Sequence, residues 1–360
     1  MNRQARTSVA INQWDRKLMM SVLWRRFAVG LVAASVLVGS GQAVAQVDSR
    51  DVPIVAQPQQ RFDSGQDIQP IYEGWTRNDD GSYMLHFGYL NRNYQEQPSV
   101  PVGRLNYFSP GDQDRGQPAY FYPRTQHFQF EVRAPATMGT SFDDALVWTV
   151  VHHGSEQKAY GWLQPEWEID VHTITSNQGM GSGHSLETLN SNEAPAVTVS
   201  ASHTTVTVGQ PVTLLGALAD DELPPVRPIR PRRDPLPALK RPDNLPAIPD
   251  NVQSYRRPQP PRNGLALLWV VYRGPAAAEF EPSGYQRALS EGGNEGSPSV
   301  RLGSTRNAAS ESTSLDGDGL TSATFETVVR FNEPGTYTLR AWASDSMLKT
   351  PADVTVTVTD

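Results

Sequence analysis

The chain has 360 residues, no cysteine and a formal net charge of −7 at pH 7. Without cysteine it can form no disulfide framework, cysteine zinc site, iron–sulfur cluster or thiol active site. The acidic balance argues against nucleic acid and anionic membranes as partners, because both attract clustered Lys and Arg. Its 28 glycines and 29 prolines exceed average usage and favour turns over long helices.

The N-terminus has the pattern of a secretory signal peptide. Arg25 and Arg26 precede an apolar run at residues 27–38, and small residues follow up to an Ala-x-Ala ending at Ala45. A run of 12 residues is too short to cross a bilayer, which needs about 20. We therefore expect residues 1–45 to be removed, leaving an exported, periplasmic or extracellular protein with no integral membrane segment. An uncleaved anchor is the alternative interpretation. Residues 46–67 are polar and predict a flexible lead.

An aromatic-rich region follows and predicts a first domain at residues 68–175. Of the 31 aromatic residues in the chain, 19 lie between positions 62 and 172. Short runs with β-rich or alternating character recur there, separated by turn signals such as Asp79-Asp80-Gly81. Strands at this spacing are typical of an antiparallel β-sandwich. The predicted strands are 71–75, 83–90, 127–132, 146–152, 157–163 and 167–174.

A second predicted domain spans residues 195–360, after a Gly/Ser/Asn-rich linker at 176–194. Alternating strands are predicted at 197–200, 205–208, 211–215, 265–272, 323–331, 336–343 and 352–359. Two segments interrupt them. Residues 221–263 contain 12 prolines, which cannot form a sheet ladder, and residues 281–322 are rich in Gly, Ser and Asn. We expect both to be long disordered insertions in the second of two sandwiches, within an all-β protein.

Residues 331–345 resemble bacterial immunoglobulin-like modules of the PKD (polycystic kidney disease) type, through the Pro334-Gly335-Thr336-Tyr337 turn and the closing Asp345. The resemblance implies a sandwich that binds, spaces or adheres rather than catalyses. It places Tyr337 in a tyrosine corner and Trp269 in the core on a central strand. The region around Tyr72 and Trp75 is similar to a domain of exported bacterial proteins without known activity.

Aromatic side chains could form a sugar-binding face, since flat rings stack on pyranose rings. The candidates compete with a second interpretation, in which the same rings form the core of a small sandwich. The residues to test are Tyr72, Trp75, Tyr89, Trp162 and Trp167.

Carboxylates at the predicted strand ends are candidate calcium ligands. Asp220, Asp221 and Glu222 end one strand and Asp345 ends another, and calcium prefers six to eight oxygen ligands. Asp316 and Asp318 could add to them. The alternative is that all are ordinary turn carboxylates.

A zinc site is a third candidate. If residues 167–174 form a strand, Glu168, Asp170 and His172 share one face, and a facing strand could add His152 or His153. Those two histidines are adjacent, so on a strand they would point to opposite faces and could not chelate together. The alternative is the solvated face of an edge strand.

No nucleophile elbow, phosphate-binding loop, dinucleotide fingerprint or His-Glu-x-x-His motif is present in the sequence. The sequence therefore favours a non-enzymatic binding or structural protein of the bacterial envelope, with an envelope protein or polysaccharide as partner. The alternatives are a carbohydrate-binding accessory protein and, third, a metal-dependent hydrolase.

Overall fold

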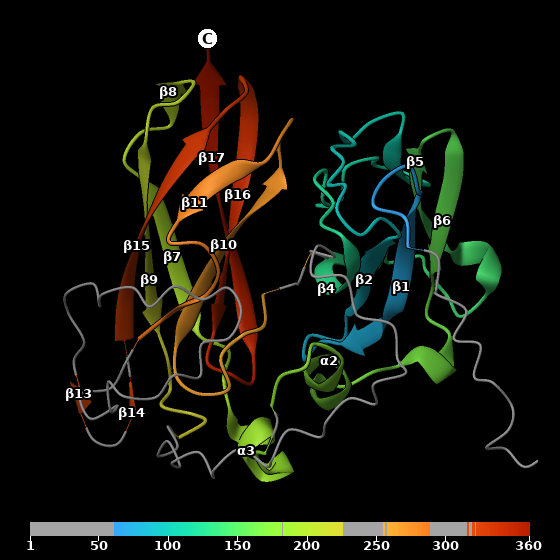
Figure 1. The fold of residues 1–360 in the computed structure, drawn as a ribbon. Helices are drawn as coiled ribbons and strands as arrows, with labels where there is room; N and C mark the ends of the chain where they lie inside the picture. Colours follow the sequence, from blue (N-terminus) through green and yellow to red (C-terminus); the bar gives the residue numbers. More distant parts are fainter. Residues whose placement is uncertain are drawn as a thin grey trace, which may run out of the picture. The chain divides into compact units, whose positions relative to one another are not determined.

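A computed structural model describes residues 61–181, 183–225, 255, 258–288, 315–316, 319–320 and 322–360. The predicted signal peptide, residues 46–60 and most of both predicted insertions lie outside the described residues. The structure confirms the predicted all-β fold class, with several mainly antiparallel sheets (Figure 1). Among the described residues, no helix is long and apolar enough to cross a membrane.

The first sandwich consists of two three-stranded antiparallel sheets. One sheet has the order β1-β2-β4, and the other has the order β3-β5-β6. The strands are β1 (Ile68–Arg77), β2 (Tyr83–Asn91), β3 (Asn106–Ser109), β4 (Arg124–Arg133), β5 (Leu146–His152) and β6 (Ser155–Gly161). The predicted strands at 71–75, 83–90, 127–132 and 146–152 therefore lie within observed ones, whereas β3 was not predicted.

Aromatic rings fill the core of this sandwich. Trp148, Phe87 and Phe108 are fully buried and contact one another, with ring centroids 5.3–6.1 Å apart. The indole Nε1 of Trp148 donates a hydrogen bond to Asn106 Oδ1 at 2.9 Å, so the one polar atom of this side chain is satisfied. The clustered aromatic residues thus supply the packing that a cysteine-free sandwich needs.

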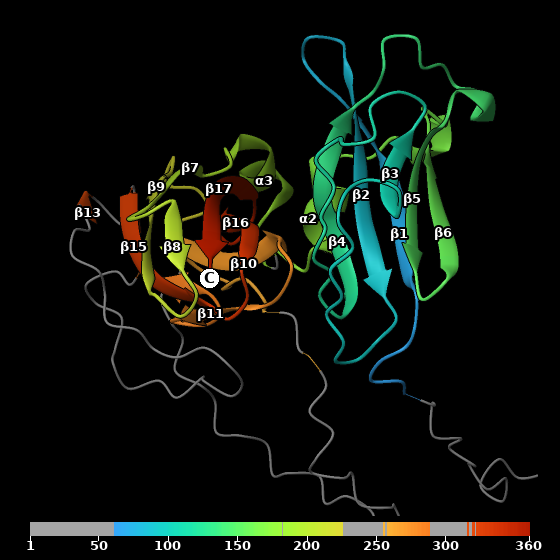
Figure 2. The same ribbon diagram turned by 90° about the horizontal axis from the view of Figure 1, so that it is seen from above.

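The second sandwich has a five-stranded and a four-stranded sheet. Their orders are β12-β10-β16-β17-β8 and β11-β15-β9-β7. Figure 2 shows β15, β9 and β7 in one layer and β10, β16 and β17 in the other. The pair β8–β17 is parallel, and the other pairs are antiparallel. The bounds are β7 (Ala196–Ala201), β8 (Thr205–Thr207), β9 (Val212–Ala219), β10 (Ala266–Arg273), β11 (Ala278–Glu281), β12 (Gln286–Arg287), β15 (Ser322–Phe331), β16 (Gly335–Ser344) and β17 (Lys349–Thr359).

Two predicted features of the second core are confirmed. Tyr337 is fully buried, and its hydroxyl donates to the backbone carbonyl of Glu333 at 2.9 Å, as in a tyrosine corner. Trp269 is 4% exposed on β10, which pairs with β16 and β12. The expectation of continuous disorder over 281–322 is wrong for β12 and for the short pair β13 (Leu315–Asp316) and β14 (Gly319–Leu320).

The segment predicted as a strand at 167–174 and a linker at 176–194 is instead partly helical. It contains a 3₁₀ turn η2 (Pro165–Trp167) and the helices α2 (Val171–Asn177) and α3 (Leu186–Ser191). The side chains of Asp170 and Ser185 accept hydrogen bonds from the backbone N–H of Thr173 and Thr188 and so cap α2 and α3. These caps start helices where alternation suggested a strand at 167–174 and where composition suggested a linker at 176–194.

Residues 61–360 belong to one unit, and direct hydrogen bonds join the two sandwiches within it. The carbonyl of Tyr272 on β10 accepts from the backbone N–H groups of Ala119 and Tyr120, at 3.1 and 3.2 Å. Arg340 on β16 donates to the carbonyl of Gln129 at 2.9 Å. The loop before β4 is thus fastened to the second sandwich by backbone contacts that composition does not reveal.

Candidate functional site

The predicted strand-end carboxylates gather at one end of the second sandwich. Asp220 and Asp221 follow β9, Asp345 follows β16, and Asn192 lies between α3 and β7. Asp345 is 2% exposed and Asn192 is 8% exposed, so the cluster includes buried polar side chains. Three separate parts of the chain therefore contribute oxygen atoms to this cluster, which we call the oxygen cluster.

Asp345 organises the oxygen cluster. Its Oδ1 accepts from the backbone N–H groups of Met347 and Leu348, both at 2.6 Å, and its Oδ2 accepts from Asn192 Nδ2 at 2.7 Å. Burial raises the pKa of Asp345, although these three hydrogen bonds oppose the increase. The side chain is thus held in one orientation and keeps its carboxylate close to the amide of Asn192.

Two buried oxygens of the oxygen cluster have no hydrogen-bond partner within the described part of the chain. They are Asp220 Oδ1 and Asn192 Oδ1. Burial, followed by the nearby charges of Asp345 and Asp221, raises the pKa of Asp220 to about 7. Unpaired buried oxygens are rare and costly, and a bound cation would satisfy both of them.

The remaining predicted ligands are Asp221, Glu222, Asp316 and Asp318. Asp221 accepts from the backbone N–H groups of Leu223 and Glu193, both at 2.9 Å. Glu222 has a positive φ of 69° and adds negative charge near Asp220. Of the other two predicted ligands, Asp316 lies in β13, and Asp318 lies outside the described residues. Asn192 was missed because a single amide before a strand has no recognisable spacing.

Three of the five predicted sugar-binding residues are buried core residues. Tyr72, Trp75 and Tyr89 are 6%, 4% and 2% exposed. Their polar tips hold nearby backbone: Tyr72 donates to the carbonyl of Trp162 and Trp75 donates to that of Gln164, each at 2.8 Å, while Tyr89 accepts from the N–H of Tyr122 at 3.0 Å. These rings therefore match the core interpretation.

The other two candidates, Trp162 and Trp167, belong to a surface row of aromatic rings. Trp167 is 41% exposed and stacks on Tyr72 at 5.3 Å with an interplanar angle of 3°. Trp162 stacks on Tyr72 with ring centroids 6.3 Å apart, and it meets Phe142 edge-to-face with centroids 5.1 Å apart. Phe142 on η1 (Phe142–Asp144) is 55% exposed and also contacts Tyr160, which is 40% exposed. We call Phe142, Tyr160, Trp162 and Trp167 the aromatic row.

The proposed zinc set of Glu168, Asp170 and His172 is not brought together, because these residues do not lie on one strand. Glu168 Oε1 lies 3.6 Å from Arg77 Nε, and Asp170 is used as the cap of α2. The histidine prediction is also wrong in one respect. The rings of His152 and His153 lie 3.9 Å apart instead of on opposite faces.

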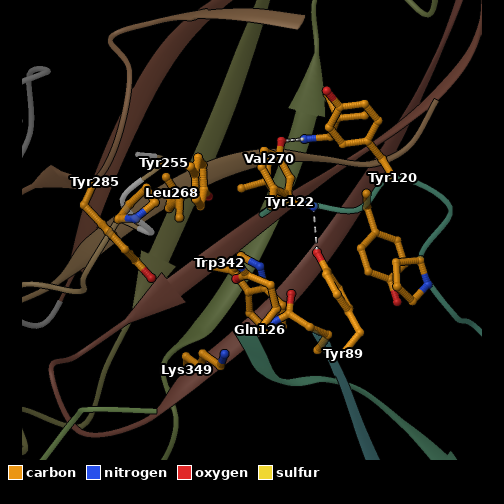
Figure 3. Close-up of a pocket in the computed structure, with 15 residues that line it drawn as sticks. Tyr89, Tyr120, Tyr122, Gln126, Tyr255, Leu268, Val270, Tyr285, Trp342 and Lys349 are labelled. Carbon is orange, nitrogen blue, oxygen red and sulfur yellow. Dashed lines mark hydrogen bonds between the residues drawn. The ribbon is translucent and has the colours of Figure 1, made fainter. Parts of the chain in front are cut away.

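A small cleft is lined by several tyrosines and by Trp342 (Figure 3). Tyr89 and Tyr122 meet there through the hydrogen bond drawn in Figure 3. The cleft offers about 40 Å³, room for a few water molecules, whereas sites for drug-sized ligands measure about 300–1,000 Å³. It therefore provides no substrate pocket in this conformation.

Comparisons with known proteins do not identify a family. No family model matches the chain, and no curated protein matches it. A solved structure described as "Crystal structure of the S-layer protein SbsC domains 4 and 5" aligns with 82% of this chain and 98% of its own. The identity is 10% and the TM-score 0.19, too low to support an inference about fold or function.

Proposed function

We propose that the chain is an exported, non-enzymatic binding or structural protein of the bacterial envelope whose second sandwich binds calcium at the oxygen cluster. The observation that carries the calcium site is the pair of buried, unpartnered oxygens on Asp220 and Asn192. Calcium takes six to eight oxygen ligands at 2.3–2.6 Å and suits carboxylates and amide carbonyls. The predicted export signal and the sandwich architecture support the assignment to the envelope.

Calcium at this position would join three parts of the second sandwich. Asp220 and Asp221 would supply carboxylates after β9, Asp345 after β16, and Asn192 an amide oxygen before β7. The ligand atoms of the three carboxylates do not all lie within 4.8 Å of one another, so binding requires the side chains to draw inward. A bound cation would keep Asp220 ionised. Through Asn192, it would also hold in place the segment between α3 and β7, where the chain enters the second sandwich.

Thermal unfolding in calcium and in EDTA tests this proposal. A ligand that binds only the folded state stabilises it by about 2.7 kcal/mol at 100 times its Kd. We expect calcium to raise the melting temperature of the unaltered chain and of Asp112→Asn, an exposed control. Asp220→Asn should lose that increase because it removes a charged ligand. An equal calcium response in all three proteins would contradict the proposal.

Carbohydrate binding is the second candidate function, and the aromatic row favours it. Phe142 contacts Tyr160 and Trp162, and the buried ring of Tyr72 links Trp162 to Trp167, so the row presents several ring faces that could stack on sugar rings. The proposed ligand is an envelope polysaccharide. Its recognition would use Trp167 and Phe142, the two most exposed members of the row.

Affinity electrophoresis in gels that contain cell-wall polysaccharide tests the aromatic row. Trp167→Ala and Phe142→Ala should migrate faster than the unaltered chain because they lose stacking surface. Leu186→Ala is the matched control, since Leu186 is 60% exposed on α3 and outside the row. Carbohydrate binding would be excluded if the polysaccharide does not retard the unaltered chain. It would also be excluded if the polysaccharide retards all the variants equally.

A further inference from the structure

We propose that Glu96, His152 and His153 form a binding site for a divalent transition metal, with Zn²⁺ as the probe. Within the described ranges, these are the one trio of His, Asp or Glu residues whose ligand atoms all lie within 4.8 Å of one another. The site belongs to the first sandwich and is independent of the proposed calcium cluster. It also differs from the predicted zinc set, because its carboxylate is Glu96.

The turn between β5 and β6 brings the two histidines together. His152 pairs with Ser155 across a two-residue turn, and His153 and Gly154 have φ values of 50° and 76°. Positive φ at both central residues is the type I′ hairpin geometry. His153 therefore leaves the alternation of the strand, and its ring comes to lie beside that of His152.

The spacing of the ligand atoms matches a tetrahedral zinc shell. His152 Nε2 lies 3.8 Å from Glu96 Oε1, and His153 Nε2 lies 3.1 Å from the same oxygen. With metal–ligand bonds of about 2.0–2.1 Å, tetrahedral geometry places neighbouring ligands roughly 3.3 Å apart. Small rotations of the side chains are therefore enough to place all three atoms around one ion.

Hydrogen bonds to the backbone orient two of the ligands, His152 and Glu96. His152 Nδ1 lies 3.2 Å from the carbonyl of Gln66, which can only accept, so Nδ1 carries the proton and Nε2 keeps its lone pair. Glu96 Oε2 accepts from the backbone N–H of Gly65 at 2.7 Å, which leaves Oε1 for the metal. Such outer contacts are typical of metal ligands.

The side chains also leave one side of the site open. His152 and Glu96 are 14% and 24% exposed, whereas His153 is 46% exposed. Three protein ligands and a solvent-facing fourth position are typical of a zinc ion that retains a water molecule. On binding, His153 must carry its proton on Nδ1 so that Nε2 can coordinate. The ion would connect the loop after β2 to the β5–β6 turn.

Calorimetric titration of the purified, untagged chain with ZnCl₂ at neutral pH tests the site. We expect one zinc ion per chain, and at least tenfold weaker binding for Glu96→Gln and His153→Asn. Asparagine tolerates positive φ and so preserves the turn while removing the ring. His172→Ala, which removes an exposed histidine on α2, is the control and should bind as the unaltered chain does.

Visible absorption with Co²⁺ provides a second readout on the same proteins. A tetrahedral site should give intense bands that His153→Asn loses, and circular dichroism should show that this variant remains folded. The proposal is overturned if the unaltered chain binds no zinc stoichiometrically. It is also overturned if His172→Ala weakens binding as much as His153→Asn does.

Discussion

Replacing Asp345 tests whether the oxygen cluster has the hydrogen bonding described above. Asp345→Ala removes the acceptor for the N–H groups of Met347 and Leu348 and for the amide of Asn192. A buried donor without a partner costs about 1–3 kcal/mol, and two backbone donors lose theirs. Removal of a desolvated carboxylate offsets part of this cost, because burial already raises its pKa. We expect a net loss of about 3–4 kcal/mol in EDTA.

Asp345→Asn separates hydrogen bonding from charge. The new amide keeps an oxygen for the two backbone N–H groups, and the amide of Asn192 can rotate so that its unpaired oxygen accepts from the new NH₂. We expect a loss of about 1 kcal/mol in EDTA, with complete loss of the calcium response.

The assay is urea unfolding in EDTA at pH 7.5, with midpoints compared at an unchanged m-value. Asp112→Ala, an exposed control, should change stability by less than about 0.5 kcal/mol. The reasoning is refuted if Asp345→Ala unfolds at the control midpoint. It is also refuted if Asp345→Asn is as destabilising as Asp345→Ala.

Three further predictions concern buried polar groups. Tyr337→Phe removes the bond to the Glu333 carbonyl and should cost about 1–2 kcal/mol in urea unfolding, whereas no change would contradict a tyrosine corner. Burial lowers the pKa of His86 to about 4. Its neutral form therefore contributes fully to folding stability above about pH 6.5, and up to about 3 kcal/mol of that stability is lost as the pH falls through 4. His86 faces Thr76 and Glu131, and His86→Gln should flatten this acid dependence in melts between pH 7 and 4; an unchanged profile would exclude His86 as its source. Without calcium, the raised pKa of Asp220 makes its contribution to folding stability fall as the pH rises from 4 to about 7. Asp220→Asn should therefore be more stable than the unaltered chain at pH 8 in EDTA. A less stable variant would contradict the raised pKa.

Period-two alternation predicted the strands well because the pleat places one face of each strand in a core. β15 and β17 alternate more buried and less buried positions along much of their length, and their bounds lie close to the predicted ones. The strand predicted from alternation at 167–174 and the linker predicted from composition at 176–194 both missed helices, because short helices of seven and six residues depend on capping side chains and show no 3.6-residue period. Their Asp-x-x-Thr and Ser-x-x-Thr spacing was the available signal.

The candidate sites were only partly predictable, because each depends on contacts between distant segments. Asp220 and Asp345 could be placed together from strand ends, but Asn192 joins them through a hydrogen bond across 153 positions of sequence. The aromatic surface was confused with the core because the sequence does not show which face of a strand is covered. His153 was misassigned since a His-Gly turn reverses the side-chain direction that strand geometry implies.

Direct calcium titration of the EDTA-treated chain by calorimetry tests the central claim most closely. We predict one calcium ion per chain at pH 8 and weaker binding at pH 6, because a proton on Asp220 must leave before the carboxylate can coordinate. Asp220→Asn and Asp345→Asn should lose this binding, while Asp112→Asn should keep it. Absence of calcium binding to the unaltered folded chain at pH 8 would contradict the account.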